Sequence, residues 1–310
     1  MAFVYGRRLM SSEKKTLGFY GLGTMGNSVA KYMHKYSMEK YGSGALVASR
    51  NCEKAKLLSE EIGASYREDF GALAAECDVI GLCLSTSKDV DDVILNPAVK
   101  LKSGTLIIDV TSGEPAMTVA LGKILAQQGV KLVDAPVSGG PAGAATGTLV
   151  SMVGGADEDF TEAFDLIDSW SEKIVKCGPL GAGNAVKAVN NVLNAAHVLI
   201  ASEGVIALKK YGVDADTALE VINCSSGMSL QSSRLPKYVL SRKFDFGFQL
   251  ALMRKDCVNA ANLVHQQTPT ATLIPEVTRL VQEAEHRFGG TVDYMKVAQY
   301  LEEQANCPMV

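Results

Sequence analysis

Three glycines, placed between a predicted strand and a predicted helix, limit the possible folds of this chain most strongly. Residues 16–20 are typical of a short strand, and Gly21, Gly23 and Gly26 follow it at once. Apolar residues at helical spacing come next, through 29–36. A dinucleotide-binding loop requires this order: Gly21 permits the tight turn, Gly23 lets the backbone approach a pyrophosphate, and Gly26 lets the helix pack on the strand. A glycine-rich turn without a ligand is the alternative.

Strand and helix patterns alternate along the first half of the chain. Buried-strand patterns recur at 45–48, 78–84, 105–110 and 130–134. This alternation predicts an α/β fold with a Rossmann-type, doubly wound parallel sheet and helices on both faces. Residues 143–155 predict a hairpin-like return that extends the sheet. The link from Gly26 to Arg50 is longer than usual for such a unit, and we expect an inserted turn at 34–44 within it.

The second half of the chain is different, because strand patterns stop beyond residue 212. Helical patterns follow at 217–223, 248–264, 274–288 and 294–304. We therefore expect a flexible N-terminal segment over 1–15, a dinucleotide-binding domain over 16–178 and an all-α C-terminal domain over 179–310. A long, proline-free interdomain helix, at about 183–210, connects the two domains.

This interdomain helix combines an apolar surface with one polar stripe. Its apolar residues fall on more than one face, which predicts a helix that is buried nearly all round. Asn184, Lys187, Asn191 and Asn194 are spaced by three, four and three residues, so they share one face. A buried ammonium needs a partner, a lowered pKa or a ligand. From the helix alone, Lys187 either pairs with a core carboxylate or takes part in chemistry.

Composition excludes several classes of protein. The chain has 310 residues with a net charge of −4 and no dense block of Lys and Arg, which argues against a nucleic-acid surface. We expect no membrane span, because polar residues interrupt the most apolar stretch. The seven cysteines are scattered without metal-type spacing, which predicts free thiols in an intracellular compartment and no metal. Residues 1–15 resemble a short mitochondrial presequence as much as a disordered start, so matrix and cytosol both stay open.

The ends of the predicted strands supply candidate cofactor contacts. The second strand ends at Ser49, Arg50 and Asn51, where an NAD-binding domain carries an acid. Arg50 therefore predicts a preference for the 2′-phosphate of NADP(H), with Ser49 and Asn51 adding neutral hydrogen bonds. If Arg50 merely stacks on adenine, NAD(H) is also usable. The other candidate cofactor contacts lie in the glycine loop, at later strand ends and on a later helix: Leu22, Thr24, Met25, Leu84, Ser85, Thr111 and Lys255.

Two further segments are candidates for substrate contacts. Ser138, Gly139 and Gly140 offer a hydroxyl and backbone N–H groups, which suit a carboxylate. Lys255 and Asp256 lie within a predicted helix beside apolar residues. This charged pair either reaches back into the cleft between the domains or lies on a solvated face.

Together these segments resemble the β-hydroxyacid dehydrogenase family, over residues 17–303. The motifs are 21–26, 134–140, 181–191 and Lys255-Asp256. The resemblance implies that Lys187 is the catalytic lysine, that Asn191 assists it, and that Ser138, Gly139 and Gly140 bind the substrate carboxylate. It implies an NAD(P)-dependent oxidoreductase that interconverts a small β-hydroxy acid, such as 3-hydroxyisobutyrate, with its semialdehyde or ketone. It also implies a homodimer or homotetramer.

The residues fit this chemistry without the family resemblance. Oxidising an alcohol needs a hydride acceptor and a base for the hydroxyl proton, and a desolvated Lys187 has a pKa suited to that task. Two alternatives remain. A decarboxylating phosphogluconate-type dehydrogenase usually has a C-terminal domain longer than residues 179–310. A non-enzymatic, cofactor-bound interaction module would have lost the lysine, which this chain keeps.

Overall fold

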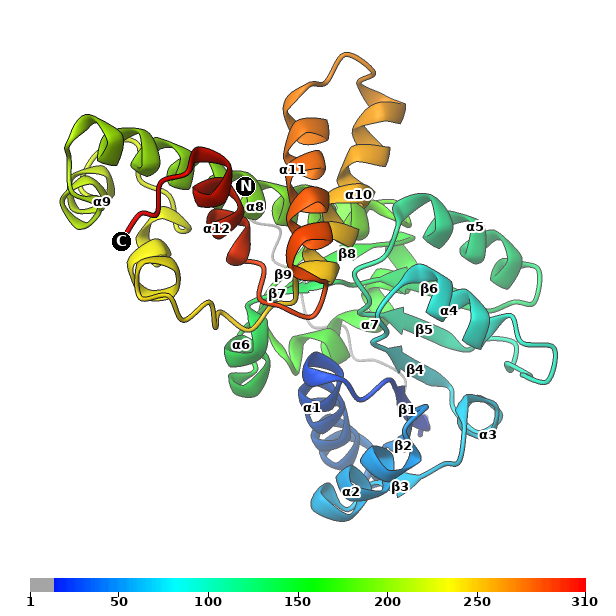
Figure 1. Cartoon of the computed structure of the whole chain (residues 1–310). Coiled ribbons are helices and arrows are strands. Elements are labelled where there is room, and N and C mark those ends of the chain that lie inside the picture. The colour runs from blue at the N-terminus through cyan, green and yellow to red at the C-terminus, as the bar shows by residue number, and fades with distance from the viewer. Residues whose placement is uncertain (1–13) are drawn as a thin grey trace.

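The computed structural model describes residues 14–310, which form two parts joined by one long helix (Figure 1). The presequence question therefore falls almost wholly outside the described residues. The first part is a mixed sheet covered by helices, and the second part is helical. This arrangement confirms the predicted fold class, with a Rossmann-type sheet, a long interdomain helix and an all-α C-terminal region.

The sheet of the described chain has the parallel order β3-β2-β1-β4-β5-β6. The chain direction across the sheet reverses between β1 and β4, and ligands bind at the carboxyl ends of strands at such a point. Beyond β6, β8 runs antiparallel to β6 and β7, and β9 runs parallel to β8. The strands are β1 Leu17–Tyr20, β2 Leu46–Ala48, β3 Ser65–Tyr66, β4 Val79–Leu82, β5 Leu106–Asp109, β6 Lys131–Asp134, β7 Val137–Ser138, β8 Leu149–Gly154 and β9 Ser171–Gly178.

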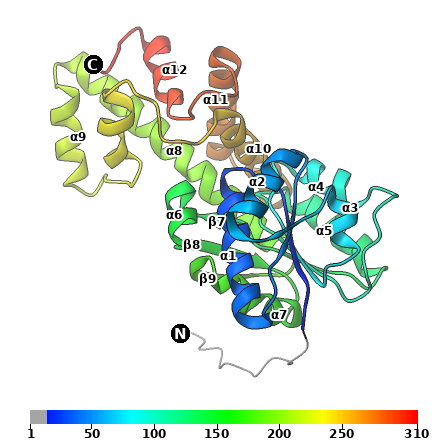
Figure 2. The same cartoon turned by 90° about the horizontal axis from the view of Figure 1, so that it is seen from below.

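Helices cover both faces of this sheet because side chains alternate along each buried strand. On β5, Leu106 and Ile108 belong to one apolar cluster and Ile107 belongs to the other. The first cluster includes residues of α1 Thr24–Tyr41, α2 Cys52–Ile62 and α7 Asp157–Asp168. The second includes residues of α3 Phe70–Ala74, α4 Ser87–Ile94 and α5 Pro115–Ala126 (Figure 2). The sheet is therefore doubly wound, as predicted.

Two local predictions in this domain need correction. The expected inserted turn at 34–44 is wrong, because α1 continues to Tyr41 and buries His34 and Ser37. Gly42 ends that helix in a left-handed conformation, with φ of 66°. The hairpin-like return contains a short helix, α6 Gly140–Thr146, which the glycine-rich sequence did not predict.

The helical part is built around α8 Ala182–Tyr211, against which most of the other helices pack. The other helices are α9 Ala215–Asn223, the short helices η1 Ser232–Arg234 and η2 Pro236–Leu240, α10 Leu250–Gln267, α11 Leu273–Phe288 and α12 Lys296–Ala305. Their buried side chains form an apolar core of their own. In Figure 2, α8 leads out of the first domain to α9 at the far end of the second.

The prediction that α8 is buried nearly all round is wrong. One face packs into the helical core, but Val186, Leu193 and Ile200 are 44%, 47% and 71% exposed. Among residues 14–310, α8 is also the one helix whose length and composition would allow it to cross a membrane. The core helix of a soluble protein passes the same test, and α8 packs against α10, α11 and α12.

Candidate active site

The glycine loop between β1 and α1 has the geometry that a dinucleotide requires. Gly21 has φ of 100°, and a Cβ there would lie 2.3 Å from the Cys83 carbonyl oxygen. A Cβ on Gly26 would lie 1.9 Å from the Gly21 oxygen, so helix and loop touch directly. A Cβ on Gly23, in contrast, would meet no atom within 4 Å. Gly21 and Gly26 therefore shape the loop, and Gly23 leaves open space above it.

This open space lies at the amino end of α1. Gly23 and Thr24 are exposed, Met25 is half-buried, and Leu22 is buried beneath them. Within the described chain, no side chain caps the helix at Gly23, so its first N–H groups are available to a ligand. Such a helix end favours an anion through its N–H groups and its dipole. The cradle fits the pyrophosphate of a dinucleotide.

Arg50 lies beside this cradle at the end of β2, because the Gly21 N–H donates to the Ala48 carbonyl at 3.2 Å. The guanidinium is 63% exposed and pairs with Asp89 at the start of α4, at 2.9 Å. The Asn51 side-chain oxygen caps the start of α2, since it accepts from the Lys54 N–H at 3.1 Å. A 2′-phosphate would thus share Arg50 with Asp89, and Asn51 retains only its amide N–H groups for it.

The start of α8 is fixed by a buried carboxylate at the end of β6. Asp134 is fully buried, and its two oxygens accept from the N–H groups of Gly181 and Asn184, both at 2.7 Å. A Cβ on Gly183 would lie 2.2 Å from the Met152 carbonyl oxygen, so only glycine allows this approach. Lys187, one turn further along the helix, is therefore held at a fixed position relative to the sheet edge.

Asn184, at the beginning of the polar stripe, has a structural role. Its side-chain oxygen accepts from the Gly113 N–H at 2.9 Å, and its amide donates to Thr118 at 3.1 Å. Both partners belong to the segment that follows β5. Asn184 thus connects α8 to the first domain, and its side-chain oxygen and amide are both bonded within the protein.

Asn191 and Asp256 form the polar centre between α8 and α10. The Asn191 amide donates to Asp256 at 2.6 Å, and the Ser112 hydroxyl donates to the other oxygen of Asp256 at 2.9 Å. Asp256 is 1% exposed. The side-chain oxygen of Asn191 accepts from Asn190 at 3.1 Å. A residue from each domain therefore binds the same carboxylate, which excludes the solvated-face alternative for Asp256.

Lys255 bridges the two domains at the carboxyl ends of β4 and β5. Its ammonium donates to the Ser85 carbonyl at 3.1 Å and to the Ser112 carbonyl, and it lies 3.2 Å from Asp256. Beside it, the buried Asn259 amide donates to the Gly113 carbonyl at 3.1 Å. The Thr111 hydroxyl accepts from the Leu84 N–H at 2.9 Å. These bonds hold the loops after β4 and β5 together at the carboxyl edge of the sheet, and those loops carry the predicted residues Leu84, Ser85 and Thr111.

Lys187 lies half-buried on α8, one turn from Asn191. Burial lowers the pKa of its ammonium, the charge of Asp256 opposes this lowering, and the charge of Lys255 adds to it. A lysine whose pKa is lowered gives up its proton more readily than an exposed lysine, so it can act both as a proton donor and as a proton acceptor. The arrangement therefore provides a proton acceptor and donor at the junction of the two domains.

Ser138 lies on β7, beyond the group of residues around Lys187. It is half-buried and pairs with Val150, and the exposed Gly139 and Gly140 follow it with φ of 136° and 64°. Among the described residues, no hydrogen bond joins Ser138 to Lys187, Asn191 or Asp256. The hydroxyl and the two glycine N–H groups are thus placed near the start of α6, where a substrate oxygen could be bound.

Sequence reasoning missed several buried polar residues of this region. The sequence places Asp134 only within the 134–140 motif. Its bonds to the α8 backbone depend on contacts between elements far apart in the chain, which residue spacing does not reveal. Asn259 follows Lys255 by one helical turn, and this spacing could have indicated it. Asp109, at the end of β5, is a third such residue, and burial raises the pKa of its carboxyl to about 7.

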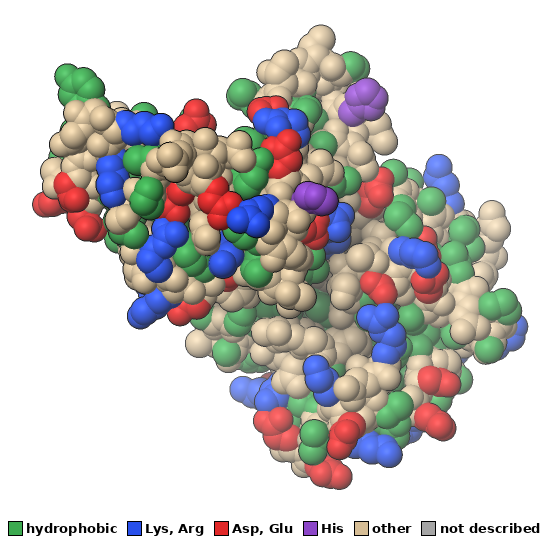
Figure 3. Space-filling view, viewed as in Figure 1, with side chains coloured by type: hydrophobic (Ala, Val, Ile, Leu, Met, Phe, Trp, Pro, Cys, Tyr) green, Lys and Arg blue, Asp and Glu red, His purple; other side chains and the backbone are tan. Residues whose placement is uncertain are grey.

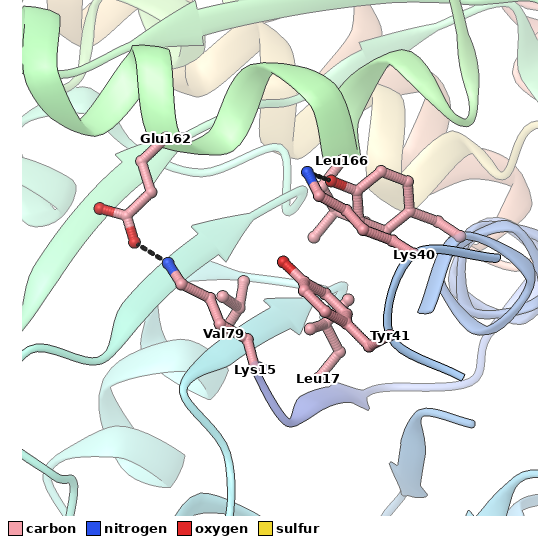
Figure 4. A pocket seen from close by; sticks show the side chains of 8 residues that line it. Lys15, Leu17, Lys40, Tyr41, Val79, Glu162 and Leu166 are labelled. Atoms are coloured by element: carbon pink, nitrogen blue, oxygen red, sulfur yellow. Dashed lines mark hydrogen bonds and ion pairs between the residues drawn. The ribbon is translucent and has the colours of Figure 1, made fainter. Parts of the chain in front are cut away.

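A separate small cavity of about 50 Å³ lies at the opposite edge of the sheet, near the amino ends of β1 and β4 (Figure 4). Lys15 pairs with Glu162 there at 2.6 Å, and Lys40 donates to Tyr36 at 2.6 Å and Asp165 at 3.2 Å. Its size excludes a dinucleotide.

In residues 14–310 no cluster of His, Cys, Asp or Glu is suited to a metal. Figure 3 shows blue and red side chains interspersed over one face of the molecule.

Two family models match the chain, one for each part. The NAD binding domain of 6-phosphogluconate dehydrogenase matches residues 16–178. A model described as the NAD-binding domain of NADP-dependent 3-hydroxyisobutyrate dehydrogenase matches residues 181–301. The boundary between the two matches falls between β9 and α8.

Three similar proteins illustrate the match. The 2-(hydroxymethyl)glutarate dehydrogenase of Eubacterium barkeri is 34% identical over 77% of this chain and 79% of its own length. The mitochondrial 3-hydroxyisobutyrate dehydrogenase of Mus musculus is 30% identical over 98% and 91%. The structure of a Mycobacterium tuberculosis 3-hydroxyisobutyrate dehydrogenase with L-serine has a TM-score of 0.82 at 26% identity, over 93% of this chain and 99% of that one.

Proposed function

Because the chain belongs to the β-hydroxyacid dehydrogenase family, whose members include NAD(P)-dependent hydroxyacid dehydrogenases, we propose that Lys187 is its catalytic acid and base. The observation that carries this proposal is the position of Lys187 on α8, one turn from Asn191, whose amide binds the Asp256 carboxylate; burial there lowers the pKa of the Lys187 ammonium. The proposed reaction converts a β-hydroxy acid to its semialdehyde, and the reverse reaction uses the same groups.

The cofactor would lie along the carboxyl edge of β1, β2 and β4. The open cradle at Gly23 would hold the pyrophosphate, and Arg50 the 2′-phosphate of NADP(H). The loops at Leu84, Ser85 and Thr111, fixed by Lys255, would line the nicotinamide half. When bound, the nicotinamide supplies the hydride acceptor or donor.

In the oxidation direction, Lys187 would accept the proton of the substrate hydroxyl. In the reduction direction, its ammonium would donate to the carbonyl oxygen as negative charge develops there. Asp256 is buried with both oxygens bonded within the protein, so we assign it to orienting Asn191 and tuning Lys187. This assignment replaces the substrate contact that the sequence analysis considered for Asp256. The amide of Asn191 and the ammonium of Lys255 are further hydrogen-bond donors at the same carboxyl edge of the sheet.

The names of the similar proteins share one chemical unit. 2-(Hydroxymethyl)glutarate, 3-hydroxyisobutyrate and L-serine all carry a hydroxymethyl group on the carbon next to a carboxylate. We therefore propose a substrate of the form HOCH₂–CHR–COO⁻. Ser138, Gly139 and Gly140 would bind the carboxylate, which sets the position of the hydroxymethyl group relative to Lys187.

The decisive experiment compares Lys187→Ala with Lys209→Ala, a control on the same helix. Reduction of NADP⁺ and NAD⁺ is followed at 340 nm with a panel of HOCH₂–CHR–COO⁻ acids. We expect Lys187→Ala to lower turnover by at least about 10²-fold, with little change in cofactor affinity. The Lys209→Ala variant should behave as the parent. Near-normal turnover of Lys187→Ala would remove this lysine from the mechanism.

The same assay, with CO₂ release measured beside it, separates the two alternatives. A phosphogluconate-type enzyme would release CO₂ from its substrate, whereas an interaction module would bind cofactor without any change at 340 nm. The second family model, which covers the helical domain, favours the 3-hydroxyisobutyrate type. The compartment, mitochondrial matrix or cytosol, stays a prediction that imaging of the chain with a C-terminal fluorescent tag would decide.

A further inference from the structure

The ion pair of Arg50 with Asp89 joins two loops on either side of the carboxyl end of β1. Arg50 follows β2, and Asp89 lies at the start of α4, which follows β4. In the sheet, β2 and β4 are the two neighbours of β1. The Arg50 guanidinium donates to Asp89 Oδ1 at 2.9 Å. The pair therefore lies at the point where the strand order reverses, and open α/β sheets bind their ligands at such a point.

The end of its own helix holds the Asp89 carboxylate in place. Asp89 Oδ2 accepts from the Thr86 hydroxyl at 2.7 Å, and the Thr86 hydroxyl accepts from the Asp89 N–H at 3.1 Å. Thr86 is the N-cap of α4, so this reciprocal pair orients the carboxylate in the first helical turn. A carboxylate has about four acceptor positions, and these bonds to Arg50 and Thr86 occupy two of them. The Asp89 side chain is 23% exposed, so it can also accept from a ligand.

This carboxylate lies close to a place where the sequence has no acid. In an NAD-binding domain, an acid at the end of the second strand accepts from the ribose 2′-hydroxyl. Here β2 is followed by Ser49, Arg50 and Asn51. The ion pair brings the Asp89 carboxylate to the same strand end from α4. Asp92, on the next turn of α4, is exposed and pairs with Lys88 instead.

We propose that Asp89 is a specificity residue for the cofactor and takes the place of the acid missing after β2. This inference rests on the proposed function, because it requires a dinucleotide in the cradle at Gly23. With NAD(H), Asp89 accepts from the 2′-hydroxyl of the adenosine ribose and keeps its bond to Arg50. With NADP(H), the carboxylate competes for Arg50 and repels the 2′-phosphate. Asp89 therefore makes NAD(H) usable and limits the preference for NADP(H) that Arg50 produces.

A purely structural role for Asp89 leads to a different expectation. An asparagine caps a helix about as well as an aspartate, and its side-chain oxygen can still accept from the Thr86 hydroxyl. Asp89→Asn therefore keeps the helix end and removes only the charge. If Asp89 serves α4 alone, this variant binds both cofactors as the parent does.

The first test measures the binding of NADP⁺ and NAD⁺ by titration calorimetry, without substrate or turnover. We expect Asp89→Asn to bind NADP⁺ about tenfold more tightly and NAD⁺ about threefold more weakly, because the phosphate loses a repelling charge and the ribose loses a charged acceptor. Asp92→Asn makes the same change of charge one turn away. Both affinities of this control should stay within about twofold of the parent, because salt screens exposed charges. Circular dichroism confirms that each variant is folded.

Two results separate this inference from the proposed function. An unchanged ratio of the two affinities in Asp89→Asn overturns the role of Asp89, while the cradle still binds both dinucleotides. A parent protein that binds neither dinucleotide overturns the proposed function as well.

The second test changes the ligand and begins with the parent protein. An NAD⁺ analogue without the 2′-hydroxyl on its adenosine ribose should bind about tenfold more weakly than NAD⁺, because the charge-assisted bond to Asp89 is lost. In Asp89→Asn this difference should shrink to about threefold, the size expected for a neutral hydrogen bond. In Asp92→Asn it should stay as in the parent. Equal affinity of the parent for NAD⁺ and the analogue would show that Asp89 does not bind the 2′-hydroxyl, and would overturn the proposal.

Discussion

The choice between cofactors depends on one exposed side chain, Arg50. An arginine can bind a 2′-phosphate with two donors, and charge-assisted bonds of this kind contribute about 1.5–3 kcal/mol, or roughly 10–150-fold in affinity. The ion pair with Asp89 holds the guanidinium beside the cradle but also competes with the phosphate. We therefore expect kcat/KM to favour NADPH over NADH by at least about 10-fold.

Replacing Arg50 with Asp should narrow or invert this ratio, mainly through weaker use of NADPH. Lys54→Asp makes the same change of charge nearby, on the exposed start of α2. It controls for the effect of that charge on the electrostatic potential around the cofactor cradle. Steady-state kinetics with both cofactors measure the effect. An unchanged ratio in the Arg50→Asp variant would mean that another group recognises the 2′-position.

The pH dependence of oxidation reports on the neighbours of Lys187. Oxidation needs the neutral amine, so its rate rises with pH through the pKa of this lysine. Burial lowers that pKa and the Asp256 carboxylate opposes the lowering. In Asp256→Asn the opposing charge is absent, so the pKa should fall further and the rising part of the kcat/KM profile should move to lower pH. A lower rate with an unmoved profile would limit Asp256 to orienting Asn191.

At the scale of elements, the sequence predicted what depends on local spacing. The loop at Gly21–Gly26 was placed correctly because a turn, a helix end and a close approach each demand a glycine. The sequence did not reveal which face of α8 is covered, because Leu193 and Leu199 look alike until the neighbouring helices are placed. The roles of Asp134 and Asp256 likewise depend on contacts between elements far apart in the chain.

The end of β5 carries a measurable effect on stability. Burial raises the pKa of Asp109 from 3.8 to about 7. Between those two values the folded state holds a proton that the unfolded state has lost, so this residue makes stability fall as pH rises, and the loss is complete above about pH 7. The Asn side chain in Asp109→Asn does not titrate, and its oxygen can still accept from the Thr111 N–H.

Asp109→Asn should therefore gain stability relative to the parent between pH 5 and pH 8, by roughly 3 kcal/mol, because about two units of the pKa shift lie within this window. Urea unfolding at both pH values measures the difference. Asp168→Asn, at the exposed end of α7, is the control. The same difference at both pH values would show that Asp109 does not titrate in this range.

At the scale of the whole molecule, the candidate site lies where two separate cores meet. The sheet and the helical domain bury different apolar clusters, while Lys255 and Asn259 bind the loops of the first domain from the second. A ligand held by those loops should therefore stabilise both domains together. At 100 times its Kd, a cofactor adds about 2.7 kcal/mol, which raises the Tm by a few degrees.

The single tryptophan makes this coupling visible. Trp170 is fully buried in the core of the first domain, so its fluorescence follows that domain, whereas circular dichroism follows the helices of both. With cofactor present, we expect the two melting curves to shift upward together. In Lys255→Ala the fluorescence curve should still shift, while the helical signal separates into an earlier phase, because the second domain loses the bonds from Lys255 to the Ser85 and Ser112 carbonyls. Curves that stay superimposed in this variant would show that α8 and Asn259 couple the domains without the lysine.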